Sequence, residues 1–318
     1  MSTMKALLLT KTGETPILSY TTVPKPTLTP GHLLIKVKAS AIQPSDLINS
    51  KGGFPLTIFP RIPGRDFSGI VVEGPQNLIG TEVFGTSGNK QAFTTDGAQA
   101  EYILVPEAAV APKPKSLSFT LAATIGVPYT TASTALRRSG AKKDDFVLVI
   151  GANGAVGSAV VQLAKGKGCK VLEASRQESA DVNTASDPQL SAIDALTNGQ
   201  GVAAIIDTVG QPALTSAAVA KLARGGTLAF IAGPRGGNQD LTFNMVDFYR
   251  GERNLAGVNT LLYSAEEYAV DLRGVGEMFD GNLLVPGSEW KQVRLEEGVA
   301  GYESAAVKGA GKFVVVMD

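Results

Sequence analysis

The chain has 318 residues, enough for two domains, and its 29 basic residues balance 29 acidic ones. That balance gives no electrostatic reason to expect nucleic acid or an anionic membrane as the main partner. No stretch approaches the roughly 18 uninterrupted apolar residues of a membrane span, and the first apolar run is too short for a secretion signal, so we expect a cytoplasmic protein. The single cysteine, Cys169, excludes an internal disulfide and any zinc site built from cysteines.

Residues 4–110 have the pattern of β-strands. The segment HLLIKVKASAI at 32–42 alternates apolar and polar side chains, which predicts a half-buried strand. The segments FSGIVV, GTEVFG and AQAEYILV repeat that pattern between glycines and prolines. We therefore expect a mostly β domain in this part of the chain.

From about residue 120 the pattern changes to alternating helices and strands. TLAATIGVPYTTASTALRRSG has helical spacing and ends on Gly140, a residue typical of a C-cap. The strands FVLVI, KVLEAS, AAIIDTV and TLAFIAG then alternate with helical segments, which predicts an α/β fold with a parallel sheet covered by helices. The last thirty residues return to a mixed pattern and end in the strand GKFVVVMD.

A glycine-rich turn follows the first strand of this second region. In VLVIGANGAVGSAV the glycines are spaced G-x-x-G-x-x-G, between a strand and a helix. The second glycine lets the backbone approach a pyrophosphate, and the third lets the helix pack closely on the strand. The alternative is a tight turn that binds nothing. We predict nucleotide contacts from Asn153, Gly154, Ala155, Val156 and Gly157.

The end of the next strand, KVLEASR, predicts which nucleotide binds. An acidic residue there would hold a ribose 2′-hydroxyl and repel a 2′-phosphate. The strand instead ends in Ser175 and Arg176, a hydroxyl and a guanidinium that suit a phosphate monoester, which favours NADPH over NADH. Glu173 lies two residues earlier, and the alternative is that Arg176 only begins a solvated loop.

These features occur in a longer ordered set of motifs. Upstream lie ASAIQPSDL, IPGRDFSGIV, GAQAEYILVPE and AATIGVPYTTASTAL, and downstream lie IIDTVG and GKFVVV. Together they resemble the medium-chain dehydrogenase/reductase superfamily, in its zinc-free quinone oxidoreductase (zeta-crystallin-like) branch. The resemblance implies a GroES-like, mostly β catalytic domain from residues 1–122 and 262–318. It also implies a Rossmann domain, a doubly wound parallel sheet, at 123–261.

The positions of the zinc ligands differ from those of zinc alcohol dehydrogenases. Motif by motif, Gln43, Arg65 and Val127 stand where those relatives carry ligands, and Arg65 would repel a cation. The only histidine, His32, lies next to Gly31 and is expected at a turn. We therefore predict no metal. Without a Lewis acid, the acceptors that remain are those that take hydride readily, namely quinones and α,β-unsaturated carbonyl compounds.

Few polar side chains are left for catalysis. Ser45 stands where zinc enzymes keep a Ser/Thr proton relay, Gln43 is a candidate donor to a developing oxyanion, and Tyr129 is a candidate proton donor. Arg65 could stabilise an oxyanion or, as the favoured alternative, form a salt bridge; Asp46 is expected to tie down its loop. An acyl-thioester enoyl reductase is disfavoured because Phe54 replaces the tyrosine of those relatives.

Position in the fold implies further cofactor contacts at the carboxyl ends of the strands. Only QESA separates Arg176 from DVN, so the helix that relatives carry there is expected to be reduced to a loop. NLAGVNT is expected to be a sixth strand, which relatives pair across a two-fold axis, so the partner expected besides the substrate is a second copy of the chain. A nucleotide-binding protein with little turnover is the alternative function. The remaining predicted cofactor contacts are Thr131, Asp207, Ala232, Gly233 and Asn259.

Overall fold

The computed structural model describes residues 2–234, 236–287 and 290–318. The chain divides into two compact units, Met1–Thr130 with Thr260–Asp318, and Thr131–Asn259. The domain borders expected from the sequence, 122/123 and 261/262, lie a few residues from these observed borders. Helix α3 (Gly126–Ser139) runs unbroken through the first observed border. Within the described residues, no helix is both long and apolar enough to cross a bilayer.

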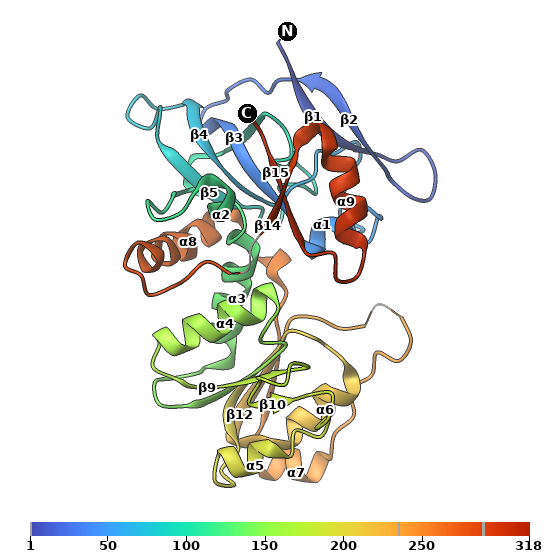
Figure 1. Cartoon of the computed structure of the whole chain (residues 1–318), viewed down its shortest axis with the longest axis vertical. Coiled ribbons are helices and arrows are strands. Elements are labelled where there is room, and N and C mark those ends of the chain that lie inside the picture. The colour runs from blue at the N-terminus through green and yellow to red at the C-terminus, as the bar shows by residue number, and fades with distance from the viewer. Residues whose placement is uncertain (1, 235, 288–289) are drawn as a thin grey trace. The chain divides into compact units, whose positions relative to one another are not determined.

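The first unit is built on a seven-stranded sheet that the C-terminal part of the chain completes. The C-terminal strand β15 lies between β3, with which it pairs antiparallel, and the edge strand β14, whereas the other five strands come from residues 32–112 (Figure 1). The strand order is β14, β15, β3, β4, β5, β7, with β6 paired to β3. The strands are β3 (His32–Ile42), β4 (Asp66–Glu73), β5 (Glu82–Thr86), β6 (Tyr102–Pro106), β7 (Ala111–Pro112), β14 (Trp290–Arg294) and β15 (Lys312–Val316).

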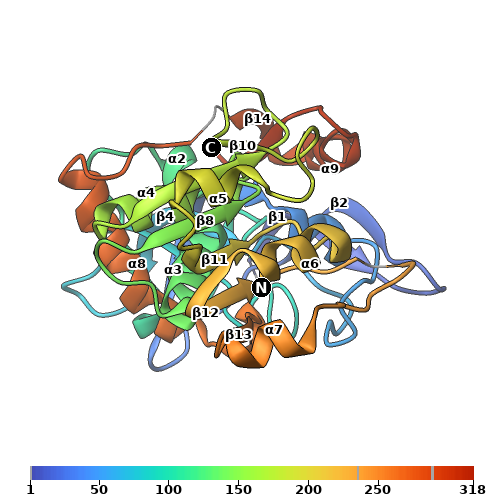
Figure 2. The same ribbon diagram turned by 90° about the horizontal axis from the view of Figure 1, so that it is seen from below.

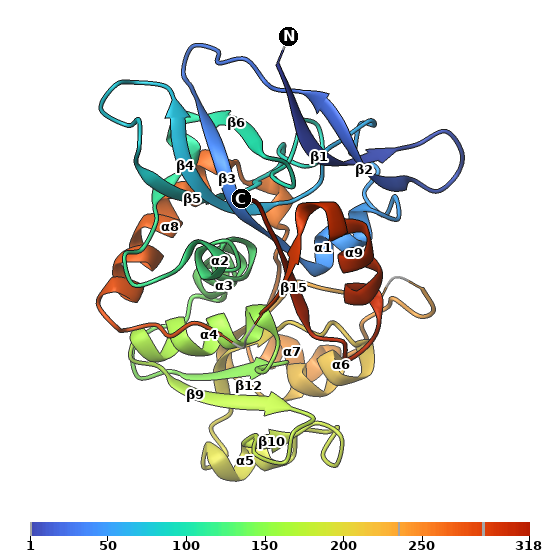
Figure 3. The same cartoon turned by 45° about the horizontal axis from the view of Figure 1, so that its top comes forward.

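A hairpin and four helices complete this unit. β1 and β2 pair antiparallel and lie beside helix α9 in Figure 3. The core beneath them is apolar and includes Leu7, Phe67 and Val315, all fully buried. The elements are β1 (Thr3–Thr10), β2 (Ile17–Pro24), α1 (Pro44–Asn49), α2 (Phe119–Ala122), α8 (Ala265–Asp280) and α9 (Gly298–Ala306), with short 3-10 turns at Glu107–Ala109, Thr260–Leu262 and Leu295–Glu297. This is the expected GroES-like, mostly β domain.

The second unit is a doubly wound parallel sheet, as expected. The chain enters at the central strand β8, winds outward through β9 and β10, and then crosses to β11, β12 and β13. Helix α4 packs on β8 and β9, and α6 packs on β12 (Figure 2). The elements are β8 (Phe146–Ile150), α4 (Ala155–Gly166), β9 (Lys170–Ser175), β10 (Val182–Asn183), α5 (Ala192–Leu196), β11 (Val202–Asp207), α6 (Pro212–Ala220), β12 (Leu222–Phe230), α7 (Met245–Arg250) and β13 (Asn254–Gly257).

The predicted short connection after β9 is confirmed. Residues 176–181 contain no helix, and β10 is only two residues long. Its first residue, Val182, pairs beside Ala174 near the end of β9. The chain therefore has to return by only about one residue along the strand direction, and a loop is long enough to make that step. Parallel strands of ordinary length need a much longer crossover.

Gly157 lets α4 pack closely against the turn that follows β8. A Cβ atom at this position would lie 2.1 Å from the carbonyl oxygen of Gly151, whereas nothing lies within 4 Å of a Cβ built on Gly274 in α8.

We expect Gly157→Ala to lower the free energy of unfolding by about 2 kcal/mol or more, because the backbone must move. Gly274→Ala is the matched control and should raise it by up to about 1 kcal/mol through helix propensity. Urea denaturation of both variants tests this, and equal effects would contradict it.

Candidate functional site

The glycine turn forms the floor of a nucleotide-sized cavity in the second unit. Gly151 has φ +83°, and a Cβ there would lie 2.4 Å from Thr208 Oγ1, so the turn fits closely beneath the end of β11. Gly154 is the N-cap of the twelve-residue helix α4. Ala155, Val156 and the buried Gly157 form its first turn, where backbone N–H groups have no partner within the helix. Such a helix end favours a phosphate.

The cavity has a volume of about 920 Å³ and lies at the carboxyl ends of the strands. Among the described residues that line it, Arg176 is the only charged one, and no carboxylate is present. The sequence analysis identified the lining residues Asn153, Gly154, Ser175 and Arg176. It missed several uncharged lining residues, because nothing in their spacing marks them: Gln177, Thr184, Pro188, Gln189, Gln211, Ala213 and Leu214.

Ser175 is held in place by two hydrogen bonds. It is 7% exposed, and its Oγ accepts hydrogen bonds from Asn153 Nδ2 at 3.0 Å and from the Gln177 backbone N–H at 3.2 Å. Arg176 is exposed and forms no hydrogen bond or ion pair with any described residue. Glu173, the nearby acid, is ion-paired with Lys165 at 2.8 Å.

The other predicted cofactor residues occupy different positions around the unit. Asp207 is fully buried and accepts hydrogen bonds from the N–H groups of Val209 and Gly210 and from Thr215 Oγ1, so it shapes the loop after β11. A Cβ on Gly210 would lie 2.2 Å from the Ala232 carbonyl oxygen, so that loop touches the segment after β12. Ala232, Gly233 and Asn259 are exposed, and Thr131 is buried in α3.

A second polar cluster lies inside the first unit, around Gln43, Arg65 and Val127. Gln43 is the N-cap of α1, and its Nε2 donates to Asp66 Oδ2 at 2.8 Å and to the Thr124 carbonyl at 3.3 Å. Val127 contributes its backbone N–H, which donates to the same carboxylate at 2.8 Å. Gln43 is 1% exposed. Its amide hydrogens are therefore already donated within the protein.

Arg65 is a buried cation at the centre of this cluster. Its Nη1 donates to Ser45 Oγ at 2.9 Å, its Nε donates to Ser87 Oγ at 2.7 Å, and the guanidinium lies 5.3 Å from the centre of the Phe93 ring. The side chain is 4% exposed. Burial lowers the pKa of Arg65, and the carboxyl groups of Asp46 and Asp66 oppose that shift. Both of its serine partners thus accept from it.

Two buried carboxyl groups accompany this cation. Burial raises the pKa of Asp46 to about 7, against an opposing attraction to Arg65. Burial also raises the pKa of Asp66 to about 6, although Thr86, the Val127 N–H and Arg65 stabilise its charged form. Asp46 Oδ2 accepts the Gln43 backbone N–H at 2.8 Å, which confirms that Asp46 ties down its loop, and its Oδ1 is buried without a hydrogen-bond partner.

Two further residues of the sequence analysis lie in this unit, the candidate proton donor Tyr129 and the single histidine, His32. Tyr129 is 5% exposed, and its ring packs edge-on against Phe279 with centroids 5.3 Å apart. His32 is half-buried at the start of β3, with Nδ1 3.0 Å from the Pro30 carbonyl oxygen. In the described part of the chain, no group of three or more His, Cys, Asp or Glu side chains could hold a metal ion.

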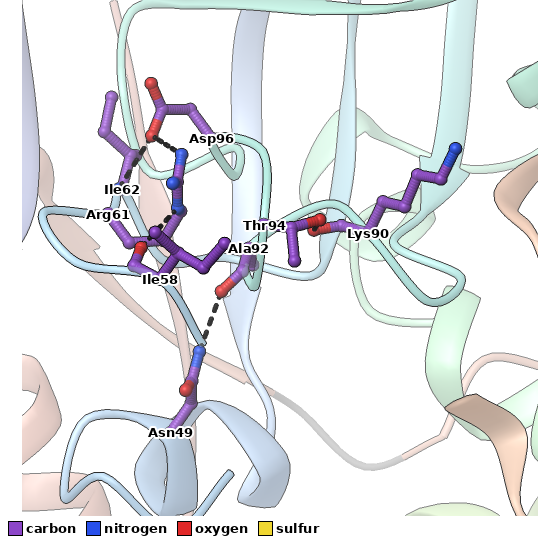
Figure 4. A network of polar contacts seen from close by, with 8 residues as sticks. All are labelled: Asn49, Ile58, Arg61, Ile62, Lys90, Ala92, Thr94 and Asp96. Carbon is purple, nitrogen blue, oxygen red and sulfur yellow. Dashed lines mark hydrogen bonds and ion pairs between the residues drawn. The ribbon is translucent and has the colours of Figure 1, made fainter. Parts of the chain in front are cut away.

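A network that the sequence did not reveal fixes the loop beside Arg65. The buried Asn49 donates to the Ala92 carbonyl at 2.8 Å, and Arg61 Nη1 pairs with Asp96 at 2.8 Å (Figure 4). Gln91 Nε2 donates to the Arg65 carbonyl at 3.2 Å. Ala92 has a positive φ of 66°, which these bonds help to hold. A single buried asparagine at the end of a short helix gives no recognisable sequence signal.

Comparison with known proteins identifies the family. A zinc-type alcohol dehydrogenase-like protein of Schizosaccharomyces pombe is 43% identical over 99% of this chain and 98% of its own length. The chain belongs to the medium-chain dehydrogenase/reductase superfamily. Family models described as alcohol dehydrogenase GroES-like domain and zinc-binding dehydrogenase match residues 29–115 and 155–273.

Within the medium-chain dehydrogenase/reductase superfamily, the chain lies in the quinone oxidoreductase branch, as the motifs implied. A quinone oxidoreductase of Lama guanicoe is 30% identical over 74% of each chain. A 2-methylene-furan-3-one reductase of Solanum lycopersicum is 37% identical over 52% of this chain and 45% of its own length. The structure of an alcohol dehydrogenase superfamily protein from Novosphingobium aromaticivorans, 22% identical, has a TM-score of 0.86 over all of both chains. The chain is therefore an oxidoreductase that uses a nicotinamide cofactor.

We expect the free energy of unfolding to fall as the pH rises from about 4 to about 7. The pKa of Asp46 is about 7 in the folded protein against 3.8 for an ordinary aspartate, so the folded state binds more protons than the unfolded state across this range. This stabilisation is complete below pH 4 and is lost as the pH passes through 7, by at most about 4 kcal/mol. Asp66 acts in the same direction.

Urea denaturation between pH 4 and 8 measures this dependence. Asp46→Asn should flatten the slope, because an amide does not titrate and can still accept the Gln43 N–H. Asp240→Asn, an exposed change in the other unit, is the control and should keep the wild-type slope. An unchanged slope in Asp46→Asn would show that Asp46 is ionised in the folded protein at low pH.

Proposed function

We propose that this protein transfers hydride from NADPH to a quinone or an α,β-unsaturated carbonyl compound, without a catalytic zinc. The observation that carries the proposal is the cavity edge at Ser175 and Arg176, where the only charged lining residue among those described is a cation. The names of two relatives support the acceptor class. One is called a quinone oxidoreductase, and the other is named for a furanone with an exocyclic methylene group, which is an α,β-unsaturated ketone.

The residues around the cavity fit NADPH. The N–H groups of the first turn of α4 would bind the pyrophosphate, and Gly154, which has no side chain, leaves room for it. Ser175 and Arg176 would bind the 2′-phosphate by a hydroxyl donor and a charged fork. The lack of any carboxylate among the described lining residues removes the usual partner of a ribose diol. When bound, the nicotinamide supplies the hydride.

The buried Arg65 supports a reaction without zinc. Its guanidinium stands at a zinc-ligand position of relatives, carries a positive charge and offers only donors, so it disfavours a cation there. Gln43 donates both amide hydrogens within the protein, and Val127 contributes only its backbone. None of the three is suited to a metal in this arrangement.

Ser45 is our first candidate for the group that contacts the substrate oxygen. Because Arg65 donates to Ser45 Oγ, the serine hydrogen remains available for an acceptor, and the half-buried side chain is accessible. Gln43 would have to give up a bond to Asp66 or Thr124 before it could donate to a substrate, and we place it second. Tyr129 remains a candidate proton donor.

We further propose a homodimer in the cytoplasm that uses neither nucleic acid nor membrane as a partner. β13 is the last strand of its sheet, so one edge of it has no neighbouring strand within the described part of this chain. Pairing of that edge with a second copy would satisfy its backbone groups.

The first experiment follows NADPH oxidation at 340 nm with 1,4-benzoquinone, 9,10-phenanthrenequinone, trans-2-hexenal and an α,β-unsaturated ketone. Each assay is repeated with NADH and, separately, after dialysis against a chelator. We expect turnover with NADPH, much slower turnover with NADH, and no loss on chelation. Equal rates with both cofactors would refute the 2′-phosphate assignment, and a loss that added Zn²⁺ restores would refute the zinc-free mechanism. Tight NADPH binding with no turnover would favour a binding protein instead.

Substitution of Ser45 tests its contact with the substrate. We expect Ser45→Ala to lower kcat/KM by about a hundredfold, the usual loss for one donor to a developing oxyanion. Ser50→Ala, at the other end of α1, removes a hydroxyl that bonds only its own helix, and should retain activity. Tyr129→Phe in the same assay tests Tyr129 as the proton donor. Wild-type turnover in Ser45→Ala would remove Ser45 from the mechanism.

A further inference from the structure

We infer that Asn153 sets the cofactor preference, by fixing the hydroxyl of Ser175 as a hydrogen-bond donor to a 2′-phosphate; this rests on the proposed NADPH-dependent function. Asn153 is a positioning residue in this assignment, since it acts through Ser175. It lies in the glycine turn directly before Gly154, and it reaches across to the end of the neighbouring strand β9.

The hydrogen bonds around Ser175 leave only the proton of its hydroxyl free to bond a ligand. A serine hydroxyl has two acceptor lone pairs and one proton to donate. Asn153 Nδ2 donates to the oxygen at 3.0 Å, and the Gln177 backbone N–H donates to it at 3.2 Å. Both lone pairs are therefore engaged within the protein. The proton is the part of the hydroxyl that remains for a ligand.

A hydroxyl that can only donate discriminates between the two cofactors. A 2′-phosphate presents charged oxygens that only accept, so it matches Ser175 and gains a charge-assisted hydrogen bond. A ribose 2′-hydroxyl carries a proton of its own, for which Ser175 offers no acceptor, and leaving such a donor unpaired is costly. The adjacent Arg176 adds positive charge and has no competing ion pair among the described residues.

Among the described residues, the surroundings provide no free carboxylate that would take over the role of an acidic residue. The carboxylate of Glu173 is ion-paired with Lys165, and the described residues of the cavity wall carry amides, hydroxyls and apolar groups besides Arg176. The backbone N–H of Gln177 could be removed only by proline, which would also restrict the backbone of the loop. Asn153 is therefore the one side chain through which the donor state of Ser175 can be changed.

The test measures dissociation constants of NADPH and NADH with the full chain by fluorescence titration. Asn153→Ala should weaken NADPH binding about tenfold and leave NADH binding nearly unchanged, because it frees a lone pair of Ser175. Asn153→Asp should weaken NADPH binding further, to about a hundredfold, since its carboxylate accepts the Ser175 proton and repels the phosphate. Asn198→Asp adds the same charge on the same unit, outside the cavity wall, and should keep the wild-type ratio.

A double-mutant cycle shows whether Asn153 acts through Ser175. In a Ser175→Ala background, Asn153→Ala should cause no further loss of NADPH affinity. A full additional loss there would overturn the inference, as would wild-type selectivity in both Asn153→Ala and Asn153→Asp. If wild-type protein bound NADPH and NADH equally, the NADPH function itself would fail, whatever Asn153 does. Should Asn153→Ala lower the melting temperature of the free protein, Asn153→Ser replaces it in the cycle.

Discussion

The first unit depends on the buried carboxylate of Asp66 at the start of β4. It accepts hydrogen bonds from Gln43 before α1, from Thr86 at the end of β5 and from the Val127 N–H in α3. A Cβ on the neighbouring Gly126 would lie 2.5 Å from its Oδ1, so α3 reaches the carboxylate only because residue 126 is glycine. One desolvated acceptor thus joins three separate segments to its own strand. Each bond offsets part of the cost of burying the charge.

Charge balance explains why the neighbouring Arg65 can be buried. A lone guanidinium at 4% exposure would be strongly unfavourable, but Asp46 and Asp66 attract it, and two serine oxygens accept its hydrogens. The same burial raises the pKa values of both carboxyl groups. The polar groups of this cluster therefore bond mainly to one another, and Ser45 is the member whose side chain is accessible. The cluster holds a positive charge inside the first unit.

At the nucleotide cavity, too, the polar side chains are held by hydrogen bonds and an ion pair within the protein. Ser175 is held by Asn153 and by the chain turning back at Gln177, and Glu173 is neutralised by Lys165. These contacts bring together residue 153, in the turn between β8 and α4, and residue 175, the last residue of β9. The short connection to β10 is what allows the 176–181 loop to border the cavity directly.

The sequence by itself determined the two-domain α/β fold, the parallel sheet, the glycine turn and the lack of a helix after β9, because strand and helix periods and glycine spacing are local properties of the chain. It also located Ser45, Arg65, Ser175 and Arg176. Only the tertiary structure decided which partners the buried polar side chains bind. Gln43 donates inward to Asp66, Asp207 shapes its own loop, Asn49 secures the Ala92 segment, and Asn153 reaches Ser175. Hydrogen-bond partners far apart in sequence depend on how strands register and loops close, and no local pattern encodes that geometry.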